Sequence, residues 1–145
     1  TVRLMRRVMA TPIPSSPMAD ETPTAEPAND DADVTLALLA ARTADAKKGT
    51  DIIVLEVGEV LAIAGYFVVC SASNPRLVRS IADDIERAIK QELGRPPMRQ
   101  EGRAEQQWIL IDYGDVIVHV FHEDQREFYE IERLYLDVPR IDWAV

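Results

Sequence analysis

Two carboxylates and an imidazole lie close together in the sequence. Asp112 and Asp115 flank Gly114, and His119 follows in the next run of apolar residues. Paired carboxylates beside a histidine could hold a divalent cation or move a proton at a bound substrate. The same residues are also typical of a tight turn, because Asp accepts hydrogen bonds from nearby backbone N–H groups and glycine tolerates a positive φ. We favour the turn and keep, as the alternative, a nucleotide-binding or nucleotidyltransferase-like enzyme that uses Asp112, Asp115 and His119.

Few other residues could support catalysis. The two histidines, His119 and His122, would point to opposite faces of a strand and could not chelate one metal ion together. The single Cys70 excludes an internal disulfide and a multi-cysteine metal site, and its apolar neighbours predict a buried thiol. The sequence contains no phosphate-binding glycine loop and no nucleophile elbow. We therefore expect a non-enzymatic protein with no metal and no cofactor, in which His119 is packed in the core or at an interface.

A hairpin must position these residues. Alternating residues from Trp108 to Phe121 predict two strands joined at Tyr113 and Gly114, with Trp108 opposite His119. One face then carries only β-branched apolar side chains: Ile109, Ile111, Val116, Val118 and Val120. The other face mixes apolar, acidic and imidazole groups: Trp108, Leu110, Asp112, Asp115, Ile117, His119 and Phe121. We interpret this second face as half core and half contact surface.

The other elements follow from apolar periodicity and from capping residues. Asn74 and Pro75 predict the start of a long helix and Gly94 its end. A nearly continuous apolar run at 51–57 predicts a strand in the centre of the sheet. The remaining expected elements are a helix at 34–48, strands at 66–71 and 98–102, and a helix from 123 to about 136. This order predicts an α/β (α+β mixed) domain with two layers and a mixed sheet of about five strands flanked by helices.

The ends of the chain differ from this domain in composition. Five of the nine prolines fall in the first 27 residues, and residues 1–17 contain three arginines and no acid. We expect residues 1–33 to be a disordered tail, residues 34–138 to be the ordered domain and residues 139–145 to be a C-terminal tail. Three interpretations of residues 1–17 stay open: a remnant of upstream translation or cloning, a short organellar transit peptide, or a native flexible tail.

Charge limits the partners. The formal net charge of −9 argues against a general binder of the nucleic-acid backbone, which needs a basic surface. An acidic protein can still bind a basic protein within a nucleoprotein particle, where opposite charge speeds association. No apolar run approaches the roughly 20 residues that cross a bilayer, so we expect no membrane segment.

Several segments in a fixed order resemble the ribosomal silencing factor family, also called Iojap-related proteins. The most distinctive has the pattern W-x-x-x-D-x-G-D, which begins at Trp108. The matching segments are residues 51–53, 66–69, 72–86, 101–102, 108–121 and 126–135. The chain departs from the family at Ala64 and Gly65, where an acid is usual, and at Tyr135, where the family has Trp.

The resemblance implies a fold similar to the nucleotidyltransferase-like architecture and a role as a translation repressor. Such a protein binds the large ribosomal subunit on large-subunit protein fourteen and sterically prevents the small subunit from joining. The resemblance assigns Trp108 to the docking surface and, with it, Asp112; we add Glu101 and Tyr129 because of their charge and outward position. We expect Trp108→Ala to leave folding largely intact and to weaken binding.

The resemblance leaves some properties open. A homodimer of the free protein is one of them, and sequence-specific binding of nucleic acid is not expected. The implied location is the cytoplasm, or an organelle if residues 1–17 are a transit peptide.

Overall fold

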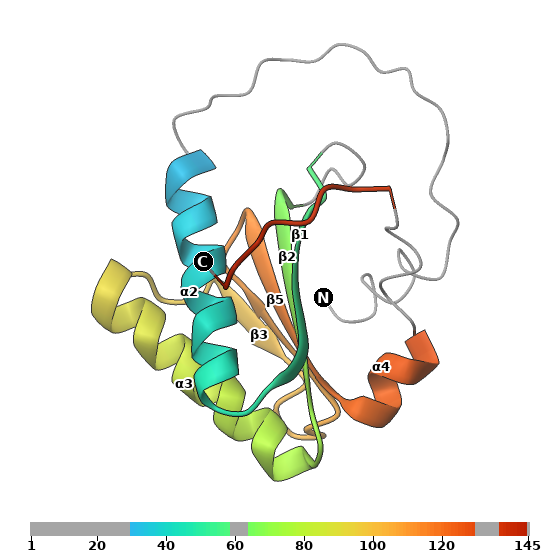
Figure 1. Cartoon of the computed structure of the whole chain (residues 1–145). Coiled ribbons are helices and arrows are strands. Elements are labelled where there is room, and N and C mark those ends of the chain that lie inside the picture. Colours follow the sequence, from blue (N-terminus) through green and yellow to red (C-terminus); the bar gives the residue numbers. More distant parts are fainter. Residues whose placement is uncertain (1–29, 59–63, 130–136, 145) are drawn as a thin grey trace.

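Five strands form one mixed sheet in the computed structural model, which describes residues 30–58, 64–129 and 137–144 (Figure 1). Across the sheet the order is β1 (Thr50–Glu56), β2 (Tyr66–Ala72), β5 (Val116–His122), β4 (Trp108–Asp112) and β3 (Arg99–Glu101). β2 and β5 are parallel, and every other neighbouring pair is antiparallel. The predicted mixed five-stranded sheet is therefore confirmed.

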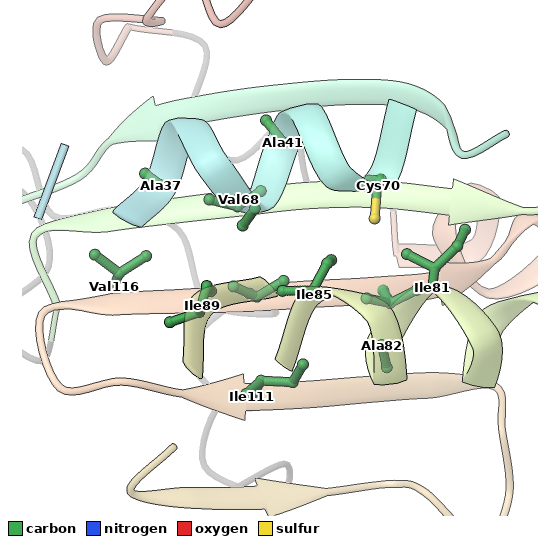
Figure 2. Close-up of a cluster of buried hydrophobic side chains, with 14 of the residues drawn as sticks. Ala37, Ala41, Val68, Cys70, Ile81, Ala82, Ile85, Ile89, Ile111 and Val116 are labelled. Carbon is green, nitrogen blue, oxygen red and sulfur yellow. The ribbon is translucent and has the colours of Figure 1, made fainter. Parts of the chain in front are cut away.

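Two helices cover one face of this sheet, α2 (Asp30–Ala46) and α3 (Pro75–Leu93). Figure 2 shows Ala37 and Ala41 of α2 over Val68 of β2, and Ile85 and Ile89 of α3 over the neighbouring strands. α2 contributes mainly alanines to this core, whereas α3 contributes mainly isoleucines. The short helix α4 (Glu123–Tyr129) lies on the other side of the sheet (Figure 1).

Both ends of α3 follow the sequence prediction. The Asn74 side chain accepts a hydrogen bond of 2.8 Å from the Leu77 N–H, and Pro75 occupies the first turn. At the other end Gly94 has a φ of 68° and donates its N–H to the Lys90 carbonyl. Each cap satisfies backbone groups that the helix leaves without a partner.

β1 lies at an edge of the sheet, so the prediction of a central strand is wrong. Its apolar run is explained by residues 139–143, which lie along its outer side. The Ile141 N–H donates to the Val54 carbonyl at 2.9 Å, and the Trp143 indole N–H donates to the Ile52 carbonyl at 2.9 Å. These residues, predicted to be a tail, therefore shield the β1 edge from solvent.

Some predicted boundaries shift, and others lie outside the described residues. α2 begins at Asp30 and ends at Ala46, a few residues earlier than predicted at both ends. Residues 1–29, and residues 130–136 of the predicted last helix, fall outside the described ranges. Within those ranges no helix is both long enough and apolar enough to cross a membrane.

Candidate functional site

The hairpin turns one residue later than the sequence predicts. The Tyr113 N–H donates to the Val116 carbonyl at 2.9 Å, which leaves Gly114 and Asp115 as the two turn residues. Trp108 therefore pairs with Phe121 rather than with His119, and Asp112 pairs with Ile117 rather than with Asp115. The predicted register is wrong by two residues. Because side chains alternate with a period of two, the two predicted faces of the hairpin keep their members.

The hairpin face opposite α2 and α3 is largely a second core, with the partly exposed Asp112 and the exposed Asp115 at its margin. Trp108 is only 2% exposed, and Phe121 is fully buried. The buried apolar members of this cluster are Leu55, Val57, Ala64, Phe67, Val69, Trp108, Leu110, Ile117 and Phe121. Trp108, which the resemblance assigns to the docking surface, is thus buried, because the sheet is apolar on both faces at this position.

Trp108 and His119 form a buried polar contact within this second core. The Trp108 indole N–H donates to His119 Nδ1 at 3.1 Å, and the Trp108 ring stacks on Phe121 at 4.8 Å between centroids. The edge of Phe67 meets the imidazole at 4.6 Å. Since Nδ1 accepts a hydrogen bond, the neutral imidazole carries its proton on Nε2, which has no hydrogen-bond partner among the described residues.

Burial lowers the pKa of His119 from 6.5 to about 3. A fully buried imidazole with so low a pKa is a poor general base near neutral pH. The prediction of a packed imidazole is confirmed. The buried Cys70 thiol behaves similarly, because burial raises its pKa to about 12 and keeps it protonated.

Asp112 is a turn residue. Its Oδ1 accepts a hydrogen bond of 2.8 Å from the Gly114 N–H, and its Oδ2 lies 3.6 Å from Arg99 Nε on β3. The Asp115 carbonyl accepts the N–H groups of both Gly65 and Tyr66, which fixes the turn to the start of β2. Among the described residues no group of three or more His, Cys, Asp or Glu side chains could hold a metal ion.

Three of the four predicted site residues share one face of the sheet. Glu101 pairs with Leu110, which places it on the same face as Trp108 and Asp112. We call the side chains of Glu101, Trp108, Leu110 and Asp112 the β3–β4 face. Tyr129 is the last residue of α4, and its side chain lies outside the described set.

Arg126 is a buried cation that periodicity alone does not reveal. It is 6% exposed, and its Nη1 donates to the Ser71 hydroxyl at 2.8 Å and to the Asp51 carbonyl. Asp51 has a φ of 50° where the pairing of β1 with β2 shifts register. Arg126 therefore links α4 to the ends of β1 and β2. It donates a hydrogen bond to a carbonyl where the backbone of β1 is irregular. A helical pattern cannot predict this, because the acceptors belong to distant residues.

The residue after Glu101, at the end of β3, must be a glycine. Its φ is 89°, and a Cβ at this position would lie 2.0 Å from the Trp108 carbonyl oxygen. Gly94 also has a positive φ, of 68°, but a Cβ there would meet nothing within 4 Å. Gly102 is therefore required both for its conformation and for its close approach to β4.

We predict that Gly102→Ala lowers the free energy of unfolding by about 3 kcal/mol or more, through backbone strain and overlap together. Gly94→Ala has the strain alone and should lower it by about 1 kcal/mol. Urea unfolding of the two variants and the wild type measures both values. Equal losses would contradict the close approach of Gly102 to Trp108.

Comparison with known proteins supports the family resemblance that the sequence segments indicate. The model of the family described as "Ribosomal silencing factor during starvation" matches residues 29–145. The chain belongs to the ribosomal silencing factor family. A ribosomal silencing factor of Bacillus subtilis is 38% identical over 104 residues, which cover 72% of this chain and 87% of that protein. Another, from Halalkalibacterium halodurans, is 36% identical and covers 72% and 88%.

Solved structures of similar chains have the same fold. A protein from Bacillus halodurans superimposes with a TM-score of 0.64 at 33% identity, over 75% of this chain and 98% of that one. A protein from Chromobacterium violaceum gives 0.68 at 28% identity, over 78% and 92%. Members of the ribosomal silencing factor family are named for silencing rather than for an enzymatic activity. Membership supports a ribosome-associated role in silencing translation.

Proposed function

We propose that this protein represses translation by binding the large ribosomal subunit through large-subunit protein fourteen, a basic protein, and by occupying the space that the small subunit needs. The observation that carries the proposal is the family match over residues 29–145, which includes every described element. No bond is made or broken in such a mechanism. It requires a folded surface that binds tightly and projects from the subunit.

The β3–β4 face supplies acidic groups for a basic partner. Glu101 and Asp112 are partly exposed on it, Asp112 with Arg99 at 3.6 Å beside it, and the exposed Asp115 lies in the adjoining turn. The whole chain carries a net charge of −9, which favours association with a cationic surface. We include Tyr129 in the docking surface as a proposal from the sequence.

Trp108 has a different role in this proposal from the one that the sequence predicts. Its buried ring stacks on Phe121 beneath the face, and its carbonyl contacts Gly102 at the end of β3. Trp108 therefore fixes the position of β3 and of Glu101 instead of presenting its ring to the partner. In this proposal Trp108 affects docking indirectly, because it maintains the shape of the β3–β4 face.

The alternative of a nucleotide-handling enzyme has little support from the geometry. Asp112 accepts a backbone hydrogen bond and lies near Arg99, and His119 is fully buried. Neither group is placed to meet a substrate together with Asp115, whose side chain is exposed in the turn.

The setting we propose is the bacterial cytoplasm or an organelle with bacterial-type ribosomes. A related protein from Zea mays, named Iojap and chloroplastic, is 31% identical over 83% of this chain and 52% of its own length. A homodimer of the free protein remains a proposal, and light scattering of the purified chain tests it.

Sedimentation with separated ribosomal subunits tests the function. We expect the protein to migrate with the large subunit and to reduce the amount of joined ribosomes when small subunits are added. We expect the double variant Glu101→Gln with Asp112→Asn to bind the large subunit roughly tenfold more weakly, because two charges facing a basic partner are lost. Asparagine at 112 can still accept the Gly114 N–H, so the turn survives.

The matched control neutralises two exposed acids elsewhere, Asp45→Asn with Glu56→Gln. It removes the same net charge away from the β3–β4 face and should bind like the wild type. If the two double variants weaken binding equally, the β3–β4 face is not the docking surface. If the wild-type protein does not migrate with the large subunit, the proposed function is wrong.

A further inference from the structure

The outer side of α3 carries cations that the described parts of the chain do not neutralise. Arg76, Arg79 and Lys90 are exposed, and none has an ion-pair partner among residues 30–58, 64–129 and 137–144. Their spacing places them along one side of the helix over about 21 Å. We call these three residues the cationic stripe.

Two acids, Asp83 and Glu86, lie on the same side of α3 between the ends of the stripe, and they share one cationic partner within the fold. Arg103, from the loop after β3, places Nη1 2.6 Å from Asp83 Oδ1 and Nη2 3.5 Å from Glu86 Oε1. Gln100 also donates to Glu86 through its side-chain amide. Arg103 therefore compensates one of the two negative charges, and the other lies nearer to Lys90 than to Arg76.

The other acids of α3 do not offset the first two turns either. Asp84 pairs with Lys47 at 2.9 Å and with Arg87 at 2.7 Å, and these pairs hold its pKa below the usual value. Glu92 is near the end of the helix, and the first turn contains no acid. An acidic protein thus keeps a local surplus of positive charge around Arg76 and Arg79.

The stripe begins at the end of the sheet where Trp108 and Glu101 lie. β2 leads into α3 after Ala72, which pairs with His122 at the end of β5. The His122 N–H donates to the Gln107 carbonyl beside Trp108. In Figure 1 the first turns of α3, drawn in green, lie at this lower end of the sheet. The stripe and the β3–β4 face lie on opposite faces of the sheet but approach the same end of it, so a large particle that extends past this end could reach Arg76.

We infer that the cationic stripe of α3 contacts the phosphate backbone of ribosomal RNA when the protein is docked on the large subunit. This inference rests on the proposed function for its partner and on the ion-pair pattern for its location. A surplus of exposed cations fits phosphates, which carry regularly spaced negative charge and need no sequence readout. Docking on a basic protein provides the affinity that an acidic chain lacks for RNA alone, and the stripe adds to it.

The test compares Arg76→Gln with Arg79→Gln, combined in one variant, against Lys48→Gln with Arg140→Gln. Lys48 and Arg140 are exposed and have no ion pair within the described ranges, so both variants lose two positive charges and no described contact. Affinity for purified large subunits is measured from about 50 to 200 mM salt. Two phosphate contacts should make wild-type affinity fall about tenfold more over this range than that of the α3 variant. The control variant should keep the wild-type salt dependence.

Two further measurements separate this inference from the proposed function. A photo-crosslinking residue at position 79 should label RNA rather than protein in the docked complex. Protein-free large-subunit RNA at low salt should bind the wild type more tightly than the α3 variant, whether or not intact subunits bind. If the affinities of the two variants for intact subunits depend equally on salt, the contact between the cationic stripe and RNA is contradicted. Binding to the large subunit itself would not be contradicted. Stripe-dependent binding to phosphatidylglycerol vesicles without RNA binding would overturn it in favour of a membrane.

Discussion

Replacing Trp108 with alanine should lower the free energy of unfolding by about 3–5 kcal/mol, the range for truncating a buried aromatic side chain. The ring is 2% exposed, stacks on Phe121 and donates its indole N–H to His119. Truncation leaves a cavity and removes the donor to a buried imidazole at once. Denaturant unfolding and the melting temperature, which should fall by on the order of 10 °C, measure the effect.

Two variants give this result its meaning. Trp143 is only partly buried against β1, so Trp143→Ala should lower the free energy of unfolding by clearly less. Trp108→Phe keeps an aromatic ring against Phe121 but loses the donor to His119. Its free energy of unfolding should be about 1–2 kcal/mol lower than that of the wild type. Losses of equal size for Trp108→Ala and Trp143→Ala would show that the Trp108 ring is not buried as described.

The same variants decide how Trp108 serves docking. If its ring touched the partner, Trp108→Phe would lose subunit binding while it remained folded. We expect Trp108→Phe to retain most of its binding, because a phenyl ring still supports β3 and Glu101. Loss of binding in a folded Trp108→Phe protein would restore the contact that the sequence predicted.

The sequence predicts most of the fold because local signals agree with it. Asn74, Pro75 and Gly94 act on backbone groups within a few residues, so the ends of α3 follow directly from residue type. The faces of the hairpin follow from a period of two, which survives the two-residue shift in register. The turn of Asp112 likewise depends on a neighbour, Gly114.

The wrong predictions depend on contacts between distant residues. β1 is apolar like a central strand because residues 139–143 shield its edge, and nothing within the strand reveals this. Burial of Trp108 depends on apolar residues of β1 and β2, such as Leu55 and Phe67, that line the same side of the sheet. Arg126 is buried because its acceptors are the Ser71 hydroxyl and the Asp51 carbonyl, more than 50 residues away. The candidate site could therefore be located from the sequence, while its exposure could not.

Lowering the pH from about 6.5 to 5 should destabilise the protein by about 2 kcal/mol through His119 alone. Burial lowers its folded-state pKa to about 3, whereas the ordinary value of 6.5 applies when the chain is unfolded. Well above pH 6.5 neither state binds a proton at this imidazole, and its contribution to stability is fully present. Below pH 6.5 the His119 imidazole is protonated in the unfolded chain but stays neutral in the folded protein. Stability then falls with each unit of pH until the folded pKa is reached near 3.

The pH dependence of unfolding in His119→Gln isolates this contribution. Glutamine does not titrate, and its side-chain oxygen can accept the Trp108 indole N–H, so the slope between pH 6.5 and 5 should nearly vanish. The matched control is His122→Gln, which removes the other histidine, partly exposed at the end of β5. Restricting the range to pH 5 and above leaves ordinary carboxylates largely ionised, so they add little. A wild-type slope that disappears with His122→Gln instead would place the acid sensitivity on the protein surface and contradict a buried, neutral His119.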